Sequence, residues 1–420
     1  MTRAQFLGGI VVVLLLAAAL RLSGVAWDGG IGAHPDERYL VGVTEGLDWP
    51  RRLDPFVLAP DLAYGHLPIT LFALLGGVDR LLAARLLTAL VDTGTVALAA
   101  ALGGSLFSRR AGLLAAGLLA VTPLHVQQAH FATVDPFLAF FATAAVLFAG
   151  RLAEDGRRAD AVFTGLASGL ALGCKAGAAL LALPLVAACW LSEVQFRRRL
   201  LRCLLAGGAA LAAFAVTNPF VVLDLPRFLR NVAAQAAMAR GAVAVPYTIQ
   251  YQGTVPYLYP ILQQAIWGMG PVLAAISFGG LAVAVIRAVR RPPNRVGWVA
   301  LTWVVPLFAF VGGLYVKFPR YLLPVSPVLV VYGAGWLART RWLGRGVAAV
   351  LALVPAGLVS LGLVLSYGEP HPWVAASGWM EGRLPGRAGI AVEEWDHPLP
   401  LGAEEYELHT LPIFAPDTEA

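Results

Sequence analysis

The sequence predicts an all-α protein that crosses a membrane many times. Charged residues make up only 13% of its 420 residues, hydrophobic residues make up 58%, and the mean hydropathy is +0.72. Soluble domains carry about 25% charged residues. Apolar segments of roughly 17–25 residues, the length that spans a bilayer, recur along the chain. An ordinary soluble domain is excluded, and the net charge of +6 does not indicate nucleic-acid binding, because most of it comes from arginines in short loops.

The apolar runs and their flanks predict eleven transmembrane helices. They lie near residues 7–25, 86–106, 111–127, 134–150, 160–177, 178–194, 202–217, 262–286, 297–316, 320–338 and 344–366. The first is expected to be a retained signal anchor, because no clear small-residue cleavage site follows it. With the N-terminus inside, the short inner loops and Arg3 hold 17 of the 31 basic residues. The positive-inside rule therefore fixes the orientation.

One apolar segment, residues 66–77 ("HLPITLFALLGG"), is too short to cross. Twelve helical residues span about 18 Å at 1.5 Å per residue. A full crossing here would also move Arg109 and Arg110 to the outer side. The segment is therefore predicted to be a re-entrant or interfacial helix within the first outer loop.

This topology gives three outer loops, at residues 26–85, 128–134 and 218–261, and an outer tail. Residues 1–366 form the predicted transmembrane domain, and residues 367–420 form a short acidic tail on the same side as the outer loops. The tail is too short to bury a core of its own. Its "GIAVEEWD" alternates like a β-strand.

The unusual polar residues fall on the outer side. Ionisable groups inside a membrane cost about 2.5–3.5 kcal/mol each, so they usually have a partner or a function. At or near the outer face lie His34, Asp36, Glu37, His66, His125, His130 and Asp135. The only two lysines, Lys175 and Lys317, lie near outer helix ends, and Arg320 follows closely. Any chemistry is therefore expected on the outer side.

Each of these residues also has a purely structural interpretation. In "HPDERYL", Pro35 is suited to the first turn of a helix, where Asp36 and Glu37 would face the positive end of the helix dipole. Asp135, which precedes Pro136, is equally well explained as the N-cap of a helix. Lys175 could extend its amine to the interface, although its depth in an apolar segment favours a function. Lys317 and Arg320 are equally well explained as interfacial anchors.

Taken in order, several segments resemble the GT-C membrane glycosyltransferases, in the branch of protein O-mannosyltransferases and lipid A aminoarabinose transferases. These segments are "HPDERYL", "YGHLPITLFALL", "HFATVDPFLAFF", "GLALGCKAGAALLALPL" and "FPRYLLPVSPVLVVYGAG". The similarity covers most of residues 1–340 and lies in the order of the motifs. In two respects the chain departs from this branch. His66 and Leu67 stand where relatives often have Lys-Pro or Pro-Pro, and the large soluble C-terminal domain is absent or reduced.

The resemblance implies roles for particular residues. Asp36 matches the catalytic acid of the first outer loop, Glu37 its neighbour, and Asp135 the acid of the second outer loop. Lys175 and Arg320, with Lys317 behind them, are expected near the donor phosphate. His34, His66, His130 and Tyr321 are expected as further substrate contacts.

The expected reaction moves a sugar from a polyprenyl-phosphate carrier to an acceptor, with inversion at the anomeric carbon. Asp36 would accept the proton of an acceptor hydroxyl, which typically contributes about 10²–10⁴-fold, and the cations would stabilise the departing phosphate. Asp135 and Glu37 would orient the sugar or hold Asp36, or a divalent metal would bind between Asp36 and Asp135. An acceptor that is already ionised would need no base. The acceptor is open among glycan, lipid and protein.

Two other classes of protein remain open at this point. A lipid or sugar transporter without chemistry would also place charged groups at helix ends. Transporters, however, often show internal repeats and polar sites at the midplane, and this sequence shows neither. A lipid-binding scaffold would leave Asp36 and Asp135 replaceable.

Overall fold

The computed structural model describes the chain except residues 49, 76–78, 193–194, 244, 291–293, 340–343, 395–396, 403–405 and 413–420. Helices dominate the described part. The first half contains α1 (Arg3–Leu22), α2 (Pro35–Glu45), α3 (Pro55–Leu58), α4 (Leu67–Leu74), α5 (Arg80–Leu106), α6 (Arg109–Ala120), α7 (Pro123–Ala129), α8 (Val134–Asp155), α9 (Arg158–Leu172), η1 (Ala176–Leu181), α10 (Ala182–Leu191) and α11 (Phe196–Thr217). The second half contains α12 (Pro219–Leu223), α13 (Leu225–Ala239), η2 (Pro246–Tyr251), α14 (Leu258–Gln263), η3 (Gln264–Gly268), α15 (Pro271–Arg290), α16 (Arg295–Gly312), η4 (Pro319–Val325), α17 (Ser326–Arg339), α18 (Gly344–Ser366), α19 (Pro372–Glu381), β1 (Gly389–Glu393) and β2 (Glu407–Leu411).

The protein is a multi-pass membrane protein, as the sequence predicts. Eight helical segments of the described chain are long and apolar enough to span a bilayer: α1, α5, α8, α11, α15, α16, η4 with α17, and α18. The other three predicted crossings coincide with shorter helices, namely α6 followed by α7, α9, and η1 followed by α10. The predicted number of eleven crossings is therefore not confirmed, although a helical segment occupies each predicted position.

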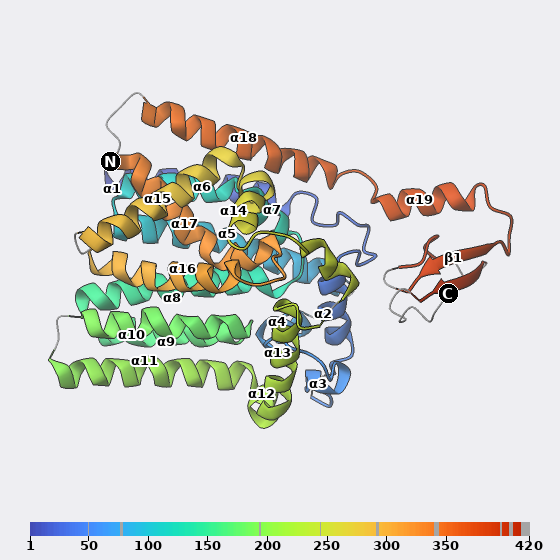
Figure 1. Cartoon of the computed structure of the whole chain (residues 1–420), viewed down its shortest axis with the longest axis horizontal. Coiled ribbons are helices and arrows are strands. Elements are labelled where there is room, and N and C mark those ends of the chain that lie inside the picture. Colours follow the sequence, from blue (N-terminus) through green and yellow to red (C-terminus); the bar gives the residue numbers. More distant parts are fainter. Residues whose placement is uncertain are drawn as a thin grey trace.

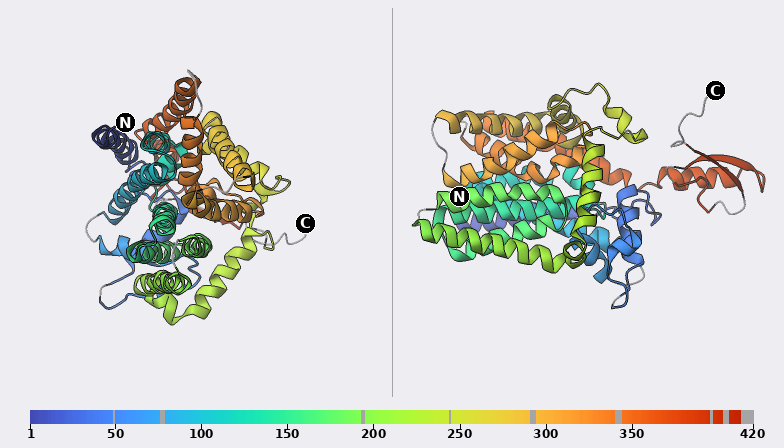
Figure 2. Two further views of the ribbon diagram at one scale, coloured as in Figure 1. Left: turned by 90° about the vertical axis from the view of Figure 1, so that its left-hand side faces the viewer. Right: turned by 60° about the horizontal axis from the view of Figure 1, so that its bottom comes forward.

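The helices form one bundle with two unlike ends (Figure 1). The N-terminus, the start of α18, the end of α10 and the start of α11 lie at one end (Figure 1). The short helices α2, α3 and α4 lie at the other end, and α13 runs across it (Figures 1 and 2). The predicted short helix in the first outer loop exists as α4, which spans only eight residues and packs against α2.

Small residues allow the bundle helices to approach closely. A Cβ added to Gly165 or Gly169 of α9 would collide with the carbonyl oxygens of Ala206 and Ala210 in α11. Small residues at such spacing are the usual way in which transmembrane helices bring their backbones together. The largest cluster of buried apolar side chains runs between α5, α6, α8, α16 and α17. The core is therefore formed by the helices of the bundle, and the candidate site described below lies at one end of it.

The tail projects beyond the bundle at the end that carries α2 (Figure 1). Strand β1 confirms the strand predicted in "GIAVEEWD", and it pairs in parallel with β2, Gly389 opposite Glu407. The start of the tail packs on the first loop, where the ring of Trp27 lies 5.7 Å from Tyr367 and 5.4 Å from His371.

Candidate functional site

Helix α2 begins as the structural interpretation predicts. Pro35 is its first residue, His34 is the N-cap, and Asp36 and Glu37 lie in the first turn. The N-cap interpretation of Asp135 is wrong, because Thr133 caps α8 and Asp135 lies within its first turn. Capping geometry alone does not decide what the acids do, since their side chains make long-range contacts.

A backbone pairing brings the first loop against the end of α9. Tyr64 and Lys175 form an isolated antiparallel bridge, and the backbone N–H of Gly65 donates to the carbonyl of Cys174 at 3.0 Å. Only glycine fits at position 65, because a Cβ there would overlap the Gly173 carbonyl. Lys175 is thereby held beside the loop that carries Tyr64.

Four charged side chains from distant parts of the sequence meet at the end of the bundle that carries α2, and we call them the charge cluster: Asp36, Asp135, Lys175 and Arg320. Arg320 donates through Nη2 to Asp36 Oδ2 at 2.8 Å, and its Nε lies 3.9 Å from Asp135 Oδ2. Lys175 Nζ donates to Asp135 Oδ1 at 2.9 Å. The two predicted acids thus share one guanidinium.

The charge cluster is neither buried completely nor fully open to water. The side chains of Asp36, Lys175 and Arg320 are 26%, 25% and 20% exposed, whereas Asp135 is only 3% exposed. Two carboxylates and two cations balance each other. Partial burial strengthens such ion pairs compared with surface pairs, and three of the four side chains still have exposed surface.

Two tyrosines enclose Lys175. Its Nζ lies 5.7 Å from the ring centroid of Tyr64 and 5.2 Å from that of Tyr321, within the range of cation–π attraction. Burial raises the pKa of Tyr64, and the neighbouring Asp36 raises it further, so its hydroxyl stays protonated. Tyr321 was predicted at the site. Tyr64 was not, although its place just before "GHLP" marks it as a loop residue near α4.

Glu37, the third predicted catalytic acid, points away from the charge cluster. Its carboxylate accepts two hydrogen bonds from Arg85, at 2.9 and 2.5 Å, and one from the backbone N–H of Ala132 at 2.7 Å. Arg85 also pairs with both oxygens of Asp28 at 2.8 Å. Glu37 is fully buried, so this geometry replaces the predicted catalytic role with a structural one. It ties α2 to α5 and to the loop that precedes α8.

The charges of this buried triad are set by burial and by pairing. Burial raises the pKa of Asp28, but the hydrogen bonds from Arg85 and from the Ala33 N–H outweigh burial and bring it to about 2. Burial also raises the pKa of Glu37, and the Arg85 and Ala132 donors counter this rise. Arg85 and Asp28 are not among the residues that the sequence predicts at the site. A lone arginine inside an apolar helix was the available signal.

Two of the predicted histidines, His34 and His130, lie in different surroundings: His34 is next to the charge cluster, and His130 is buried away from it. His34 caps α2 through Nδ1 and stacks on Phe131, with ring centroids 4.3 Å apart. Burial lowers the pKa of His34 to about 4, although Asp36 nearby opposes the shift. His130 is fully buried, and its ring nitrogens lie 2.7 Å from the Val126 carbonyl and 2.9 Å from the Ser23 carbonyl. The predicted substrate contact of His130 therefore does not fit this geometry.

His66 is buried and electrically neutral. Its side chain is 1% exposed, and neither ring nitrogen has a hydrogen-bond partner among the residues that the structure describes. Its backbone N–H donates to Asn218 Oδ1 at 2.6 Å. Burial lowers the pKa of His66 to about 4.

The pKa of His66 predicts a loss of stability in acid. The unfolded chain binds a proton near pH 6.5, whereas the folded chain binds one only near pH 4, so protons favour unfolding as the pH falls through this range. We expect the melting temperature of the purified protein to fall between pH 6.5 and pH 4, and to fall less steeply in His66→Phe. Equal slopes for the two proteins, measured by intrinsic fluorescence, would contradict this explanation.

Lys317 lies outside the charge cluster. Its Nζ donates to Thr254 Oγ1 at 2.9 Å and to the Tyr315 carbonyl at 2.8 Å. The side chain is buried, and burial lowers its pKa. The prediction that Lys317 stands behind Arg320 at a phosphate is not supported by these contacts. They tie the loop after α16 to the segment before α14.

The acids of the charge cluster fit a divalent metal poorly. In the part of the chain that the structure describes, no three His, Cys, Asp or Glu side chains converge. Asp36 and Asp135 each accept from a cation, and a hard metal ion normally takes six or more oxygen ligands. The donor set favours an anion between the two cations over a metal between the two acids.

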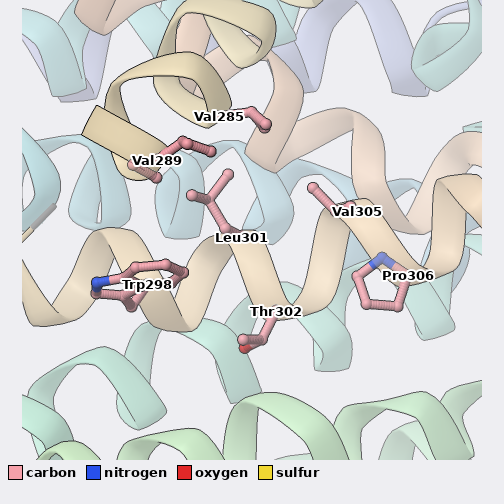
Figure 3. A pocket seen from close by; sticks show the side chains of 8 residues that line it. Val285, Val289, Trp298, Leu301, Thr302, Val305 and Pro306 are labelled. Carbon is pink, nitrogen blue, oxygen red and sulfur yellow. The ribbon is translucent and has the colours of Figure 1, made fainter. Parts of the chain in front are cut away.

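An apolar groove lies elsewhere, between α15 and α16 (Figure 3). It has a volume of about 290 Å³ and is lined by Val285, Ala288, Val289, Trp298, Leu301, Thr302, Val305 and Pro306. These residues come from the last part of α15 and the first two thirds of α16. That is the end of the helix pair remote from η4, which carries Arg320.

The fold of this chain is that of the GT-C membrane glycosyltransferases. The oligosaccharyltransferase of Archaeoglobus fulgidus superposes with a TM-score of 0.58 at 17% identity, covering 91% of this chain and 59% of that one. ArnT from Cupriavidus metallidurans, bound to undecaprenyl phosphate, superposes with a TM-score of 0.57 at 18% identity, covering 99% of this chain and 87% of that one. At these identities the similarity shows the fold, and the predicted GT-C architecture is confirmed.

The sequence resemblance is confirmed more specifically in one segment. Residues 65–223 match the family model described as dolichyl-phosphate-mannose-protein mannosyltransferase. This segment runs from just before α4 to the end of α12, so it includes Asp135 and Lys175. No curated protein shows significant similarity to the sequence.

Proposed function

We propose that this protein is a glycosyltransferase that moves a sugar from a polyprenyl-phosphate carrier to an acceptor at the membrane surface. The observation that carries the proposal is the charge cluster, in which Asp36, Asp135, Lys175 and Arg320 meet at one end of the bundle. The match of residues 65–223 to the mannosyltransferase family supports it. The fold supports it as well. The same fold is found in ArnT bound to undecaprenyl phosphate and in the archaeal oligosaccharyltransferase in complex with dolichol phosphate.

The chemistry follows from the charges. The acceptor oxygen attacks the anomeric carbon, the bond between that carbon and the phosphate oxygen breaks, and the phosphate leaves with the bonding electrons. Asp36 takes the proton of an acceptor hydroxyl. Arg320 and Lys175 stabilise the phosphate as its charge grows, which fixed cations in a partly dry site do well. Asp135 orients both cations, and the attack inverts the anomeric configuration.

We place the charge cluster on the extracytoplasmic side of the cell membrane. The arginine-rich loops, with the N-terminus, belong to the opposite end of the bundle, and the positive-inside rule assigns that end to the cytoplasm. In this arrangement residues 1–366 are the catalytic domain and residues 367–420 are a short outer tail. The charge cluster lies at one end of the bundle, whereas the site of a transporter is expected near the midplane of the membrane, so the cluster favours an enzyme over a transporter.

The proposal is tested by incubating purified protein with polyprenyl-phosphate sugars and acceptors, and measuring the release of polyprenyl phosphate. Lys175→Gln is expected to lower the rate by about 10²-fold or more, the usual effect of removing one preorganised donor from a developing anion. Lys317→Gln is the matched control, because it removes the other lysine of the chain, which lies outside the charge cluster. Equal losses in the two variants, or no release with any donor, would overturn the proposal.

A further inference from the structure

A buried polar chain crosses the core of the bundle, away from the charge cluster. Arg21 in α1 donates through Nε to Asp92 Oδ2 at 2.7 Å. Asp92 in α5 contacts His125 Nδ1 in α7 through Oδ1 at 2.7 Å, and His125 Nε2 lies 2.6 Å from Ser326 Oγ at the start of α17. All four residues are 0% exposed. We call them the buried chain.

The buried chain is not a hydrolytic triad, although a serine, a histidine and an aspartate follow one another in it. A nucleophile must reach its substrate, and none of these side chains has any exposed surface. Burying four polar groups is unfavourable unless each is paired. Their pairing is complete, because Arg21 also donates to the Ala120 carbonyl at 2.9 Å. Such an arrangement holds the helices that carry these side chains in fixed positions relative to one another.

The buried chain combines one charged pair with two neutral links. Arg21 carries a permanent positive charge, which the carboxylate of Asp92 neutralises. His125 bridges Asp92 and Ser326, with Nδ1 on the Asp92 side and Nε2 on the Ser326 side. The Ser326 Oγ also lies 2.8 Å from the Leu323 carbonyl. The chain therefore ends on the element that precedes α17.

That element is η4, which carries Arg320 and Tyr321. It is a 3-10 helix of seven residues, longer than such helices usually run, and its two prolines, Pro319 and Pro324, lack backbone N–H groups. Side chains hold it in place. Gln264 Nε2 donates to the Pro319 carbonyl at 2.9 Å, and Trp303 Nε1 donates to the Pro324 carbonyl at 3.2 Å.

We propose that the buried chain positions Arg320. By anchoring Ser326 to α5 and α7, it fixes the end of η4 and so sets the distance from the Arg320 guanidinium to Asp36 and Asp135. Asp92, His125 and Ser326 are thus positioning residues that act through η4 and touch no substrate. The expected effect on the rate of sugar transfer rests on the proposed function. The expected effect on the order of η4 does not.

Two variants remove the link to Ser326 without leaving Asp92 unpaired. Ser326→Ala deletes the hydroxyl. His125→Asn keeps an N–H donor near the place of Nδ1, so Asp92 retains its partner, but it no longer reaches Ser326. Ser277→Ala is the matched control, because Ser277 lies in the neighbouring α15, is also fully buried, and has no hydrogen-bond partner for its Oγ among the described residues.

The structural test is hydrogen–deuterium exchange of the full-length protein in lipid nanodiscs. Peptides that cover residues 319–326 are expected to exchange about threefold to tenfold faster in Ser326→Ala and in His125→Asn, the factor that one buried hydrogen bond provides. The double variant should exchange no faster than either single variant, since both break the same link. Unchanged exchange, or an equal change in Ser277→Ala, would overturn the positioning role.

The kinetic test uses the transfer assay. Both variants are expected to lower kcat about 10- to 100-fold, as small misplacements of reacting groups do, with the KM for the polyprenyl-phosphate donor changed less than about twofold. A rise in KM at constant kcat would contradict the role, because it would place the effect in ground-state binding. If the unchanged protein transfers no sugar, the proposed function fails, and the exchange measurement alone still decides whether the buried chain anchors η4.

Discussion

Asp36→Asn is expected to reduce sugar transfer by about 10²–10⁴-fold, the usual contribution of a positioned general base. The amide cannot accept the proton of an acceptor hydroxyl, but its oxygen still accepts the hydrogen bond that Arg320 now makes at 2.8 Å. The charge cluster should therefore keep its shape. The rate of polyprenyl-phosphate release at saturating donor gives the measurement, and the melting temperature confirms that the variant is folded.

Asp155→Asn provides the control for Asp36→Asn. Asp155 is an exposed aspartate at the end of α8, where it lies 3.5 Å from Arg157, and the same neutralisation there should leave transfer within about twofold, as for most surface pairs. A loss of less than about tenfold in Asp36→Asn would contradict the base role. That result would instead indicate an acceptor that is already ionised, for which Asp36 only orients Arg320.

Arg85→Met should destabilise the fold more than any substitution in the charge cluster. It leaves Asp28 and Glu37, both 0% exposed, without the cation that neutralises them. Removing one partner of a buried ion pair typically costs about 3–5 kcal/mol. The expected result is a large drop in melting temperature at pH 7, measured by thermal unfolding in the same detergent. The drop should shrink at lower pH, because carboxyl groups that have lost their cation take up protons there.

A partial rescue distinguishes lost charge pairing from lost packing. Arg85→Met combined with Asp28→Asn and Glu37→Gln removes the whole set of charges, and buried ion pairs replaced together are often tolerated. The triple variant is expected to be more stable than Arg85→Met alone. A control, Arg230→Met on exposed α13, should leave the melting temperature unchanged. If the triple variant melts no higher than the single one, charge pairing is not what Arg85 contributes.

The sequence was enough to predict the fold because the membrane imposes simple rules. Composition and helix length revealed the bundle, the order of the motifs revealed the GT-C class, and Pro35 correctly marked the start of α2. The number of crossings was harder to predict, because the helices α6, α9 and α10 are shorter than a standard membrane-spanning helix. Short helices adjoin two of them, α7 after α6 and η1 before α10, so neither forms one continuous helix of the usual spanning length.

The charge cluster was predicted in part for a different reason. Ionisable residues near one face of a membrane are few, so Asp36, Asp135, Lys175 and Arg320 were recognisable as candidates before their contacts were known. The orientation of a side chain, however, depends on tertiary contacts that the sequence does not encode locally. Glu37 follows Asp36 directly, yet successive helical residues point about 100° apart, and only Asp36 faces Arg320.

The mutual neutralisation of Asp36 and Asp135 by Arg320 and Lys175 bears on the order of events. A phosphate that pairs with the Arg320 guanidinium competes with the two carboxylates for it, and the more exposed of the two is Asp36. Donor entry would then release Asp36 from its ion pair at the moment when a proton acceptor is needed. Without a donor, Asp36 stays paired with Arg320. Its carboxylate is then less available to accept a proton from water or from another hydroxyl compound.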